Sequence, residues 1–511
     1  MTPTDASAAG GNTATPTADE PPQNASRRRL LQGATALAST LAASAALAST
    51  AQAPASSSEA PAGVLDVVII GGGLAGLTAA RDLHRSGNRS FVVLEARNRV
   101  GGRTLNHHLR NGYISEAGGQ WVGPGQTAVT DLARELEIGT FKSDFSGRGV
   151  YRMGKGRVED DTHGGVDLDP KVLAEFDALA RSLRSTKPWL SANAKELDKM
   201  SVTDWLAKRN VNQQDMLTWQ FATVLTMGSS MANTSLLQYL GLVNCAGGFQ
   251  VLEAQKDGAQ ESRFHGGSQA LSIKMAEELK GFVRLVHPVL KIAGWDQAIT
   301  EVHTPHGVFR ARKVIVALSP SLCHRISYEP ELPADRQQLH RRWPTHGPFA
   351  KTAMVYDEPF WFRKGYNGQT GCVTGPVIWS YDNSPPDKTL GVINAFVRVG
   401  ELPSNHDAAE RMLANIYADS FNDKRFLKPL EYHLQDWGQE PYTLSCVPPM
   451  PPGFMTSGLM PALTRNVGAL IWSGTETADI WYGYMDGAVR SGHRAALEAL
   501  QSLNGRKGAV A

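Results

Sequence analysis

The fold is decided by residues 64–104, which read VLDVVIIGGGLAGLTAARDLHRSGNRSFVVLEARNRVGGRT. Val67–Ile70 is a continuous apolar run that ends at glycine, which is typical of a buried parallel strand. We expect a helix over about 74–84 and a second apolar strand over 91–94. The order of strand, glycine-rich turn, helix and strand predicts a nucleotide-binding α/β unit.

Three glycines in the turn match the GxGxxG pattern of dinucleotide sites. Gly71 permits the tight turn, Gly73 lets the backbone approach a pyrophosphate, and Gly76 lets the helix pack closely on the strand. Phosphate would then lie at the helix N-terminus, where free N–H groups and the helix dipole favour an anion. Glu95, nineteen residues after Gly76, can accept hydrogen bonds from an adenosine ribose and would repel a 2′-phosphate. These features disfavour NADP and leave NAD and FAD open.

A second glycine pair and a cluster of arginines follow Glu95 at once. They are Arg97, Arg99, Gly101, Gly102 and Arg103. A solvated basic loop is one interpretation of this stretch. The other is that it suits a long, doubly anionic cofactor lying across the sheet.

The N-terminus has the three parts of an export signal in order. Residues 26–31, SRRRLL, resemble the twin-arginine signal of bacteria, and a short apolar segment follows over 33–48. Residues 51–53, AQA, fit the small-x-small cleavage pattern. We therefore expect a signal peptide over 1–53, a flexible linker over 54–63 and a periplasmic protein, with a disordered Ala-rich tail as the alternative.

The composition limits the class of protein. With 42% hydrophobic and 20% charged residues, the 511-residue chain is expected to be soluble and to form two or three domain-sized units. A net charge of +2 gives no reason to expect nucleic acid or an acidic membrane surface as a partner. The four cysteines are too scattered for a disulfide scaffold, and we see no transmembrane segment after the leader.

Five segments together resemble the flavin-containing monoamine oxidase family. In chain order they are VVLEARNRVGGRT (92–104), EAGGQWVGP (116–124), ESRFHGGSQALS (261–272), KTAMVYDEPFW (351–361) and IWSGTETADIWYGYMDGAV (471–489). The resemblance covers about 64–497, nearly the whole mature chain. It selects FAD as the cofactor, and it implies no metal.

The resemblance implies an α/β fold, α+β overall, in two domains. A Rossmann-like FAD-binding domain would be assembled from the discontinuous segments 64–140, 265–340 and 440–505. A substrate-binding domain would take 141–264 and 341–439. Two apolar runs that meet Ser-Pro or Gly, RKVIVALSP (312–320) and GALIWSGTETA (468–478), read independently as strands of the first domain.

Two residues would carry the chemistry. On pattern alone, Lys351 in an otherwise apolar strand indicates an edge-strand lysine that reaches solvent. The resemblance instead makes it the family's lysine, which holds a water against flavin N5 and would assist flavin reoxidation. Tyr484 would form one wall of the family's aromatic cage, which orients the amine. The mammalian enzymes have a second cage tyrosine where this chain has Val447, so we expect a wider or differently shaped site.

The same resemblance assigns the remaining binding residues. It places at the cofactor Gly71, Gly73, Gly76, Glu95, Arg97, Gly102, Arg103, Gly119, Gln120, Trp121, Val289, Trp437, Cys446, Gly474, Glu476, Tyr484 and Met485. It places at the substrate Val224, Leu225, Gln260, Val447 and Tyr484. Cys446 matches the cysteine that some members bond to the flavin 8α-methyl, and covalent attachment stays open here.

The implied reaction is oxidation of an amine. The amine would lose a hydride equivalent from its α-carbon to the flavin, and the imine product would hydrolyse to an aldehyde. Electrons would pass to O2, giving H2O2, or to a periplasmic acceptor. The alternatives are a diamine or polyamine oxidase, with Glu253 as its acidic residue, and an L-amino-acid oxidase, for which no arginine can be assigned. A non-enzymatic FAD-fold binding protein is disfavoured by Lys351 and Tyr484. Whether the chain forms a homodimer stays open.

Overall fold

The computed structural model describes residues 63–153, 156–160, 167–184, 186–345, 349–372, 374–444 and 449–507. The expected signal peptide, all but the last residue of the linker, and both Cys446 and Val447 lie outside these ranges. Within them, no helix combines the length and the apolarity needed to cross a membrane.

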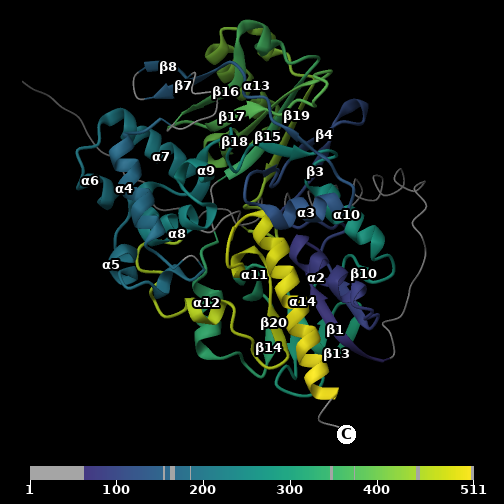
Figure 1. Ribbon diagram of the computed structural model, residues 1–511. Coiled ribbons are helices and arrows are strands. Elements are labelled where there is room, and N and C mark those ends of the chain that lie inside the picture. The colour runs from purple at the N-terminus through teal and green to yellow at the C-terminus, as the bar shows by residue number, and fades with distance from the viewer. Residues whose placement is uncertain are drawn as a thin grey trace, which may run out of the picture. The chain divides into compact units, whose positions relative to one another are not determined.

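An eight-stranded sheet contains the expected nucleotide unit (Figure 1). Its order is β10 (Val283–Arg284), β2 (Phe91–Leu94), β1 (Val64–Ile70), β13 (Gly307–Val316), β12 (Thr300–Thr304), β11 (Lys291–Ala293) and β14 (Ser327–Glu329), with β20 (Leu470–Trp472) also on β13. Strands β10, β2, β1, β13 and β20 pair in parallel, whereas β12 runs antiparallel to β13. The apolar runs near 67, 91, 312 and 470 thus form neighbouring strands.

The parallel strands end together at one edge of this sheet. Ile70 lies opposite both Leu94 and Val316, and Val316 lies opposite Trp472. The glycine turn, Glu95 and the segment before Gly474 therefore leave the sheet at the same edge. That edge is where ligands bind in open parallel sheets.

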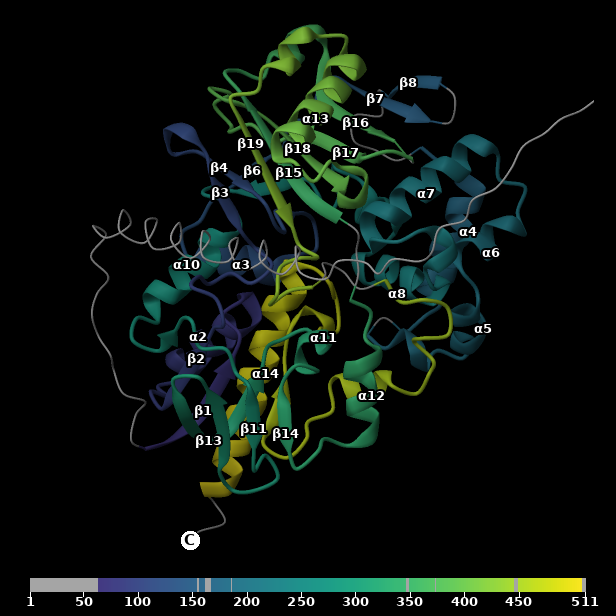
Figure 2. The same cartoon turned by 180° about the vertical axis from the view of Figure 1, so that it is seen from behind.

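Two helices pack side by side against this sheet. They are α2 (Leu74–Arg85), one residue longer than expected, and α14 (Met485–Lys507). Both views show the pair together (Figures 1 and 2). Leu77 and Leu83 of α2 share a buried cluster with Val489 of α14 and with the strands beneath. This packing fixes the start of α2 at the sheet edge.

A second sheet is antiparallel throughout. Its order is β17 (Val377–Asp382), β18 (Gly391–Arg398), β15 (Phe349–Tyr356) and β19 (Glu431–Asp436). Lys351 lies on β15, paired with Phe396 on one side and Gln435 on the other. The edge-strand interpretation of Lys351 is therefore wrong, because β15 is an interior strand.

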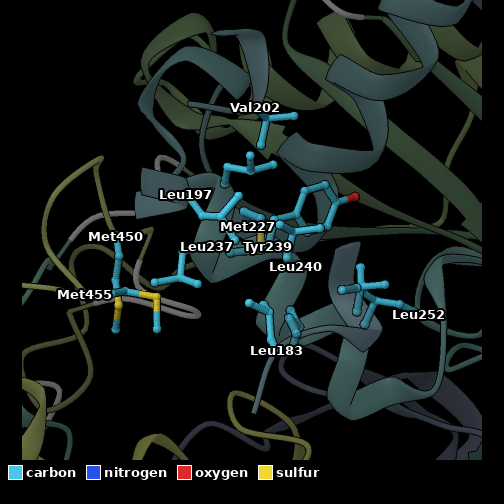
Figure 3. Packing of buried hydrophobic residues seen from close by; sticks show 14 of the residues in the cluster. Leu183, Leu197, Val202, Met227, Leu237, Tyr239, Leu240, Leu252, Met450 and Met455 are labelled. Carbon is cyan, nitrogen blue, oxygen red and sulfur yellow. The ribbon is translucent and has the colours of Figure 1, made fainter. Parts of the chain in front are cut away.

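Six helices surround a separate hydrophobic cluster. They are α4 (Pro170–Arg181), α5 (Ala194–Lys199), α6 (Val202–Ala207), α7 (Gln213–Met227), α8 (Leu236–Ala246) and α9 (Phe249–Glu253). Asp169 caps helix α4, since its side chain accepts the Lys171 N–H, and the helix buries Val172, Phe176 and Ala180 at helical spacing. Figure 3 shows part of this cluster around Tyr239.

The remaining elements connect these layers. In one small sheet β3 (Asn106–His108) pairs with β4 (Ile114–Glu116). In a second, β9 (Ser262–Phe264) lies between β5 (Trp121–Val122) and β6 (Thr140–Lys142), and in a third, β7 (Arg148–Met153) lies between β16 (Tyr366–Cys372) and β8 (Gly156–Asp160). The other α-helices of the described residues are α3 (Thr127–Glu135), α10 (Gln269–Glu278), α11 (Pro320–Cys323), α12 (Ala334–Arg342) and α13 (His406–Phe421). The boundaries expected for the two domains stay a prediction.

Candidate active site

The glycine turn after β1 has the shape that phosphate binding needs. Gly71 has a φ of +108°, and a Cβ on Gly76 would lie 2.0 Å from the Gly71 carbonyl oxygen. Gly73 precedes α2, and no side chain caps the first N–H groups of that helix. Leu74 and Ala75 of the first turn line the same cavity as Gly71 and Gly73. The helix N-terminus thus faces a cavity, as an anion site requires.

Glu95 is held in place directly beside this turn. Its carboxylate accepts the backbone N–H groups of Gly72 at 2.7 Å and Arg97 at 2.9 Å. Arg97 in turn donates to the hydroxyl of Thr443 at 2.6 Å and lies over the ring of Tyr442. A fixed carboxylate at this position fits the ribose hydroxyls of a dinucleotide.

The second glycine turn, Gly101 and Gly102, lies against the first. A Cβ on Gly102 would lie 3.3 Å from the Cα of Gly73, so the two turns approach closely. Next to them Arg103 forms an ion pair with the buried Glu476 at 2.8 Å. Because the glycines of the two turns carry no side chains, a pyrophosphate could approach the backbone there closely.

A single cavity of about 640 Å³ begins at these turns and extends to α7 and α9. The residues predicted from the sequence that line it are Gly71, Gly73, Glu95, Arg97, Gly102, Arg103, Gly119, Gln120, Trp121, Leu225, Gln260, Gly474, Tyr484 and Met485. The structure thus brings together residues from nearly the full length of the described chain. The glycine turns, the open helix start and the length of the cavity fit a bound FAD.

Six predicted residues are not among those that line the cavity. Gly76 lies under the glycine turn, and Glu476 holds Arg103. Trp437 donates its indole N–H to the Ala117 carbonyl at 2.8 Å. The other three are Val224, buried on α7, Val289, which packs against the core of the large sheet, and Lys351. Cys446 and Val447 lie outside the described residues.

Lys351 is buried immediately behind Gln120 and Trp121. Its ammonium donates to the Gly118 carbonyl at 2.9 Å and to the side-chain oxygen of Gln120. The rings of Trp121, Tyr381 and Phe396 surround it at 5.5 to 5.8 Å from the nitrogen. Two oxygen acceptors and three aromatic faces offset part of the cost of burying the charge.

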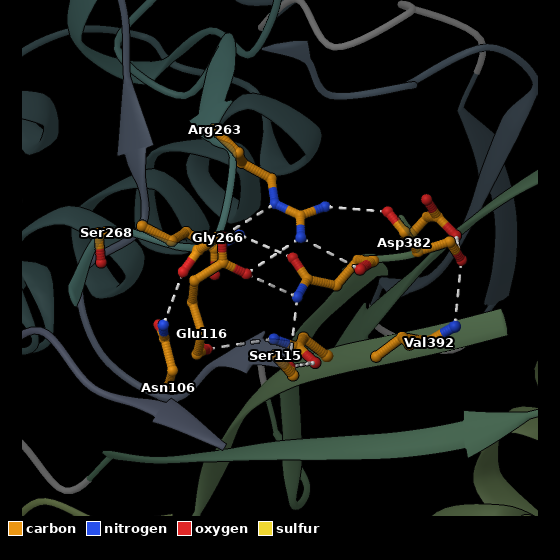
Figure 4. A network of polar contacts seen from close by, with 12 residues as sticks. Asn106, Ser115, Glu116, Arg263, Gly266, Ser268, Asp382 and Val392 are labelled. Carbon is orange, nitrogen blue, oxygen red and sulfur yellow. Dashed lines mark hydrogen bonds and ion pairs between the residues drawn. The ribbon is translucent and has the colours of Figure 1, made fainter. Parts of the chain in front are cut away.

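Gln120 is joined to a buried polar network that includes Glu116 and Arg263, which Figure 4 shows. Gln120 donates to Asn383 at 2.9 Å, and Asn383 donates to Glu116 at 3.0 Å. Glu116 is fully buried and pairs with Arg263 at 3.0 Å. Burial alone would raise the pKa of Glu116, but the Arg263 guanidinium and the hydrogen bonds hold that pKa below its usual range. The position of Lys351 therefore depends on a chain of contacts that ends at this ion pair.

Aromatic side chains line the end of the cavity away from the glycine turns. Besides Trp121 and Tyr484 they are Tyr151, Phe221, Trp379 and Phe396. The last four come from β7, α7, β17 and β18, and no motif in the sequence marks them. Tyr151, Trp379 and Tyr381 form one buried cluster against which Trp121, Phe221, Leu225 and Phe396 pack. This end is an apolar pocket suited to the carbon skeleton of a small molecule.

Gln260 and Glu253 are two polar side chains on the wall of this pocket. Gln260 donates to the Leu252 carbonyl at 3.2 Å, while its buried side-chain oxygen has no hydrogen-bond partner among the described residues. Glu253 accepts the Tyr239 hydroxyl at 2.7 Å and the Thr226 hydroxyl at 2.6 Å. Burial raises the pKa of Glu253 to about 7, which these two hydrogen bonds partly oppose. Both side chains offer acceptors to a substrate that carries N–H groups.

The charged side chains of the cavity are divided between its two ends. On the described wall the cationic ones are Arg97 and Arg103, both beside the glycine turns, where the Glu95 carboxylate also lies. At the far end are the carboxylates of Glu159, Asp160, Asp167, Asp215 and Glu253. Glu159 is paired with Arg148, and the other carboxylates of the far end favour a cationic ligand there.

Comparison with known proteins agrees with this geometry. A family model described as flavin containing amine oxidoreductase matches residues 74–500. The flavin-containing amine oxidase A of Equus caballus is 34% identical over 465 residues, covering 86% of each chain.

Two solved structures are similar over nearly their full length. Cyclohexylamine oxidase from Brevibacterium oxydans is 29% identical with a TM-score of 0.79, covering 86% of this chain and all of its own. Putrescine oxidase bound to putrescine is 30% identical with a TM-score of 0.77, covering 86% of this chain and 99% of its own.

Proposed function

Because this chain belongs to the flavin containing amine oxidoreductase family, it is an FAD-dependent amine oxidase, and we propose that its substrate is an amine with an apolar body and no carboxylate. The charge and shape of the far end of the cavity carry this proposal. Aromatic rings line it, and its charged groups on the described wall are carboxylates. A cationic amine is attracted to such a site, whereas the carboxylate of an amino acid is repelled.

One set of residues would bind the cofactor, and another would bind the substrate. FAD, when bound, supplies the acceptor for two electrons and a hydrogen from the carbon beside the amine nitrogen. Gly71, Gly73 and the start of α2 would hold its pyrophosphate, and Glu95 its ribose. Tyr484 and the aromatic wall would orient the amine and exclude water. The released imine hydrolyses to an aldehyde and ammonia or a smaller amine.

A diamine or polyamine is the second candidate substrate. Glu253 on the wall of the aromatic pocket favours it, because a carboxylate there could bind a second ammonium group. The similarity to putrescine oxidase points in the same direction.

We also propose that O2 or a periplasmic acceptor takes the electrons and that the enzyme is exported. The sequence SRRRLL over 26–31 and the motif AQA over 51–53 support export by the twin-arginine route. Replacing Arg27 and Arg28 with lysine should keep the enzyme in the cytoplasm with its flavin bound. Recovery of that variant in the periplasmic fraction would contradict the proposal.

Anaerobic mixing with candidate substrates tests the substrate proposal. The panel contains phenylethylamine, tyramine, putrescine, a cyclic secondary amine and an L-amino acid, and the flavin absorbance is followed. We expect the arylalkylamines to bleach the flavin fastest. Fastest bleaching by putrescine would favour the second candidate, and bleaching by the amino acid would refute the exclusion of carboxylates. An α,α-dimethyl amine, which has no α-hydrogen, is the negative control.

A further inference from the structure

Glu253 is a carboxyl group that the fold holds rigidly at the aromatic end of the cavity. It is the last residue of α9, a short helix whose Phe249 and Leu252 are fully buried in the helical cluster. Figure 3 shows Leu252 and Tyr239 within that cluster. The Glu253 side chain has area open to the cavity, where it accepts one hydrogen bond on each oxygen. One further lone pair of each oxygen is left for a ligand.

An amine oxidase needs a group that accepts a proton from its substrate. A simple alkylamine in water is an ammonium ion, with a pKa of about 10 like that of lysine. Oxidation at the α-carbon needs the nitrogen lone pair, so the ammonium must lose a proton before it reacts. The aromatic wall that surrounds the substrate makes this loss easier, because burial disfavours the charged form of an ammonium.

We propose that Glu253 is the group that accepts this proton. The carboxylate takes H⁺ from R–CH2–NH3⁺, giving R–CH2–NH2 and a neutral Glu253 carboxylic acid. One N–H bond breaks, one O–H bond forms, and no electron is transferred. The proposal rests on the proposed function, since it concerns how the amine of that reaction becomes reactive.

The surroundings of Glu253 suit this exchange. Helix α7 presents the Thr226 hydroxyl and helix α8 presents the Tyr239 hydroxyl, and neither is charged. Tyr484, Gln255 and Gln260 share the cavity wall, and no cation on the described wall lies at this end. Without a nearby cation, a neutral acid and a neutral amine are favoured over a buried ion pair.

The pKa of Glu253, raised by burial to about 7, is consistent with this role. The group is about half ionised at pH 7 and a carboxylate at more alkaline pH, and it holds a proton more firmly than an exposed glutamate does. An ordinary carboxyl would return the proton to the amine, and a strongly basic group would already be protonated before substrate arrived.

The test compares two substrates in the holoenzyme and in Glu253→Gln. One substrate is an arylalkylamine that reduces the wild-type flavin. The other is its β,β-difluorinated analogue, whose ammonium is mostly deprotonated in water at pH 8 because fluorine withdraws electrons. The second-order rate constant of anaerobic flavin reduction is measured from pH 6 to 10. Asp257→Asn, an exposed site four residues away, is the matched control.

We expect Glu253→Gln to lower the rate constant for the ordinary amine by about 10²-fold at pH 7. That rate constant should recover about tenfold per pH unit as the free amine deprotonates in solution. For the difluorinated amine, variant and wild type should differ by less than about threefold. Asp257→Asn should match the wild type with both substrates.

Two results would overturn the proposal. If Glu253→Gln lowers the rate constant equally for both amines at all pH values, Glu253 has a structural role. A loss confined to diamines would make it a binding site for a second ammonium. If no amine reduces the wild-type flavin, the proposed function itself fails, which is a different outcome from unchanged kinetics in the variant.

A direct readout does not depend on turnover. Binding of the α,α-dimethyl analogue, which cannot be oxidised, should produce a protonated-carboxyl C=O band in infrared difference spectra of the wild type. The band should be absent in Glu253→Gln. Tyr239→Phe removes a hydrogen bond that lowers the pKa of Glu253, so it should move the acid limb of the pH profile to higher pH. The assignment would be refuted if the acid limb did not move in Tyr239→Phe, or if the wild type gave no infrared band.

Discussion

The buried ion pair between Arg263 and Glu116 supplies the sharpest stability prediction. Arg263→Met would leave the Glu116 carboxylate fully buried without its cation. Breaking one side of a buried pair costs about 3–5 kcal/mol. With an unfolding entropy of about 2.1 cal/mol/K per residue over roughly 450 residues, this corresponds to a fall in Tm of about 3–5 °C.

The sign of the pH dependence makes this prediction specific. In the wild type the pKa of Glu116 is lowered, so its contribution to stability is present above the unfolded pKa of about 4.3 and is lost as pH falls further. In Arg263→Met, burial dominates and raises that pKa, so the folded state takes up a proton as pH falls from 8 to 5. The Tm deficit should therefore be largest at pH 8 and smaller at pH 5.

Calorimetry of the holoenzyme with excess FAD measures this, with two comparisons. The double variant Arg263→Met/Glu116→Gln should be more stable at pH 8 than Arg263→Met alone, because no unpaired charge remains. Arg310→Met, which breaks an exposed pair with Glu301, should shift Tm by less than about 1 °C. A deficit that is the same at pH 5 and pH 8, or additive effects in the double variant, would refute the reasoning.

Three further changes test the site. Gly76→Ala should abolish FAD binding, seen as loss of flavin absorbance in the purified protein, because the new methyl group would lie 2.0 Å from the Gly71 carbonyl oxygen; retention of the flavin would contradict this geometry. Lys351→Met should slow reoxidation of the reduced enzyme by about 10²-fold while anaerobic reduction by an amine changes little, and a reversed pattern in stopped-flow traces would remove Lys351 from reoxidation. Phe221→Ala should enlarge the aromatic pocket and improve kcat/KM for bulkier amines about tenfold relative to small ones; an unchanged ratio would show that Phe221 does not limit substrate size.

Local pattern was enough to predict the elements around the cofactor. The glycine turn, α2, β2 and Glu95 lie together in about 30 residues, so short-range spacing determines their geometry. The positions of Lys351 and Tyr484 came from resemblance, because single residues far apart in sequence carry no periodic signal. Pattern alone would have put Lys351 on an edge strand, since an apolar strand does not reveal its neighbours.

The substrate end was the part that sequence reasoning could not assemble. Tyr151, Phe221, Trp379 and Phe396 lie on four different elements, and each reads locally as an ordinary core residue. Glu253 was named only as a candidate acid, and nothing in its neighbours in sequence indicates that Tyr239 and Thr226 would hold it. Tertiary packing decides such contacts, and the sheet register brings the strands that carry them together.

The hydrogen bond from Arg97 to Thr443 has a consequence for how the enzyme is made. It joins residues 346 positions apart and brings the cofactor loop against a late segment of the chain. At about 5–20 residues per second, Thr443 is synthesised about 20–70 s after Arg97. The ribosome therefore exposes the glycine turn long before the chain can enclose a ligand. Cofactor loading is expected to be a post-translational event, limited by the closing of this long-range contact.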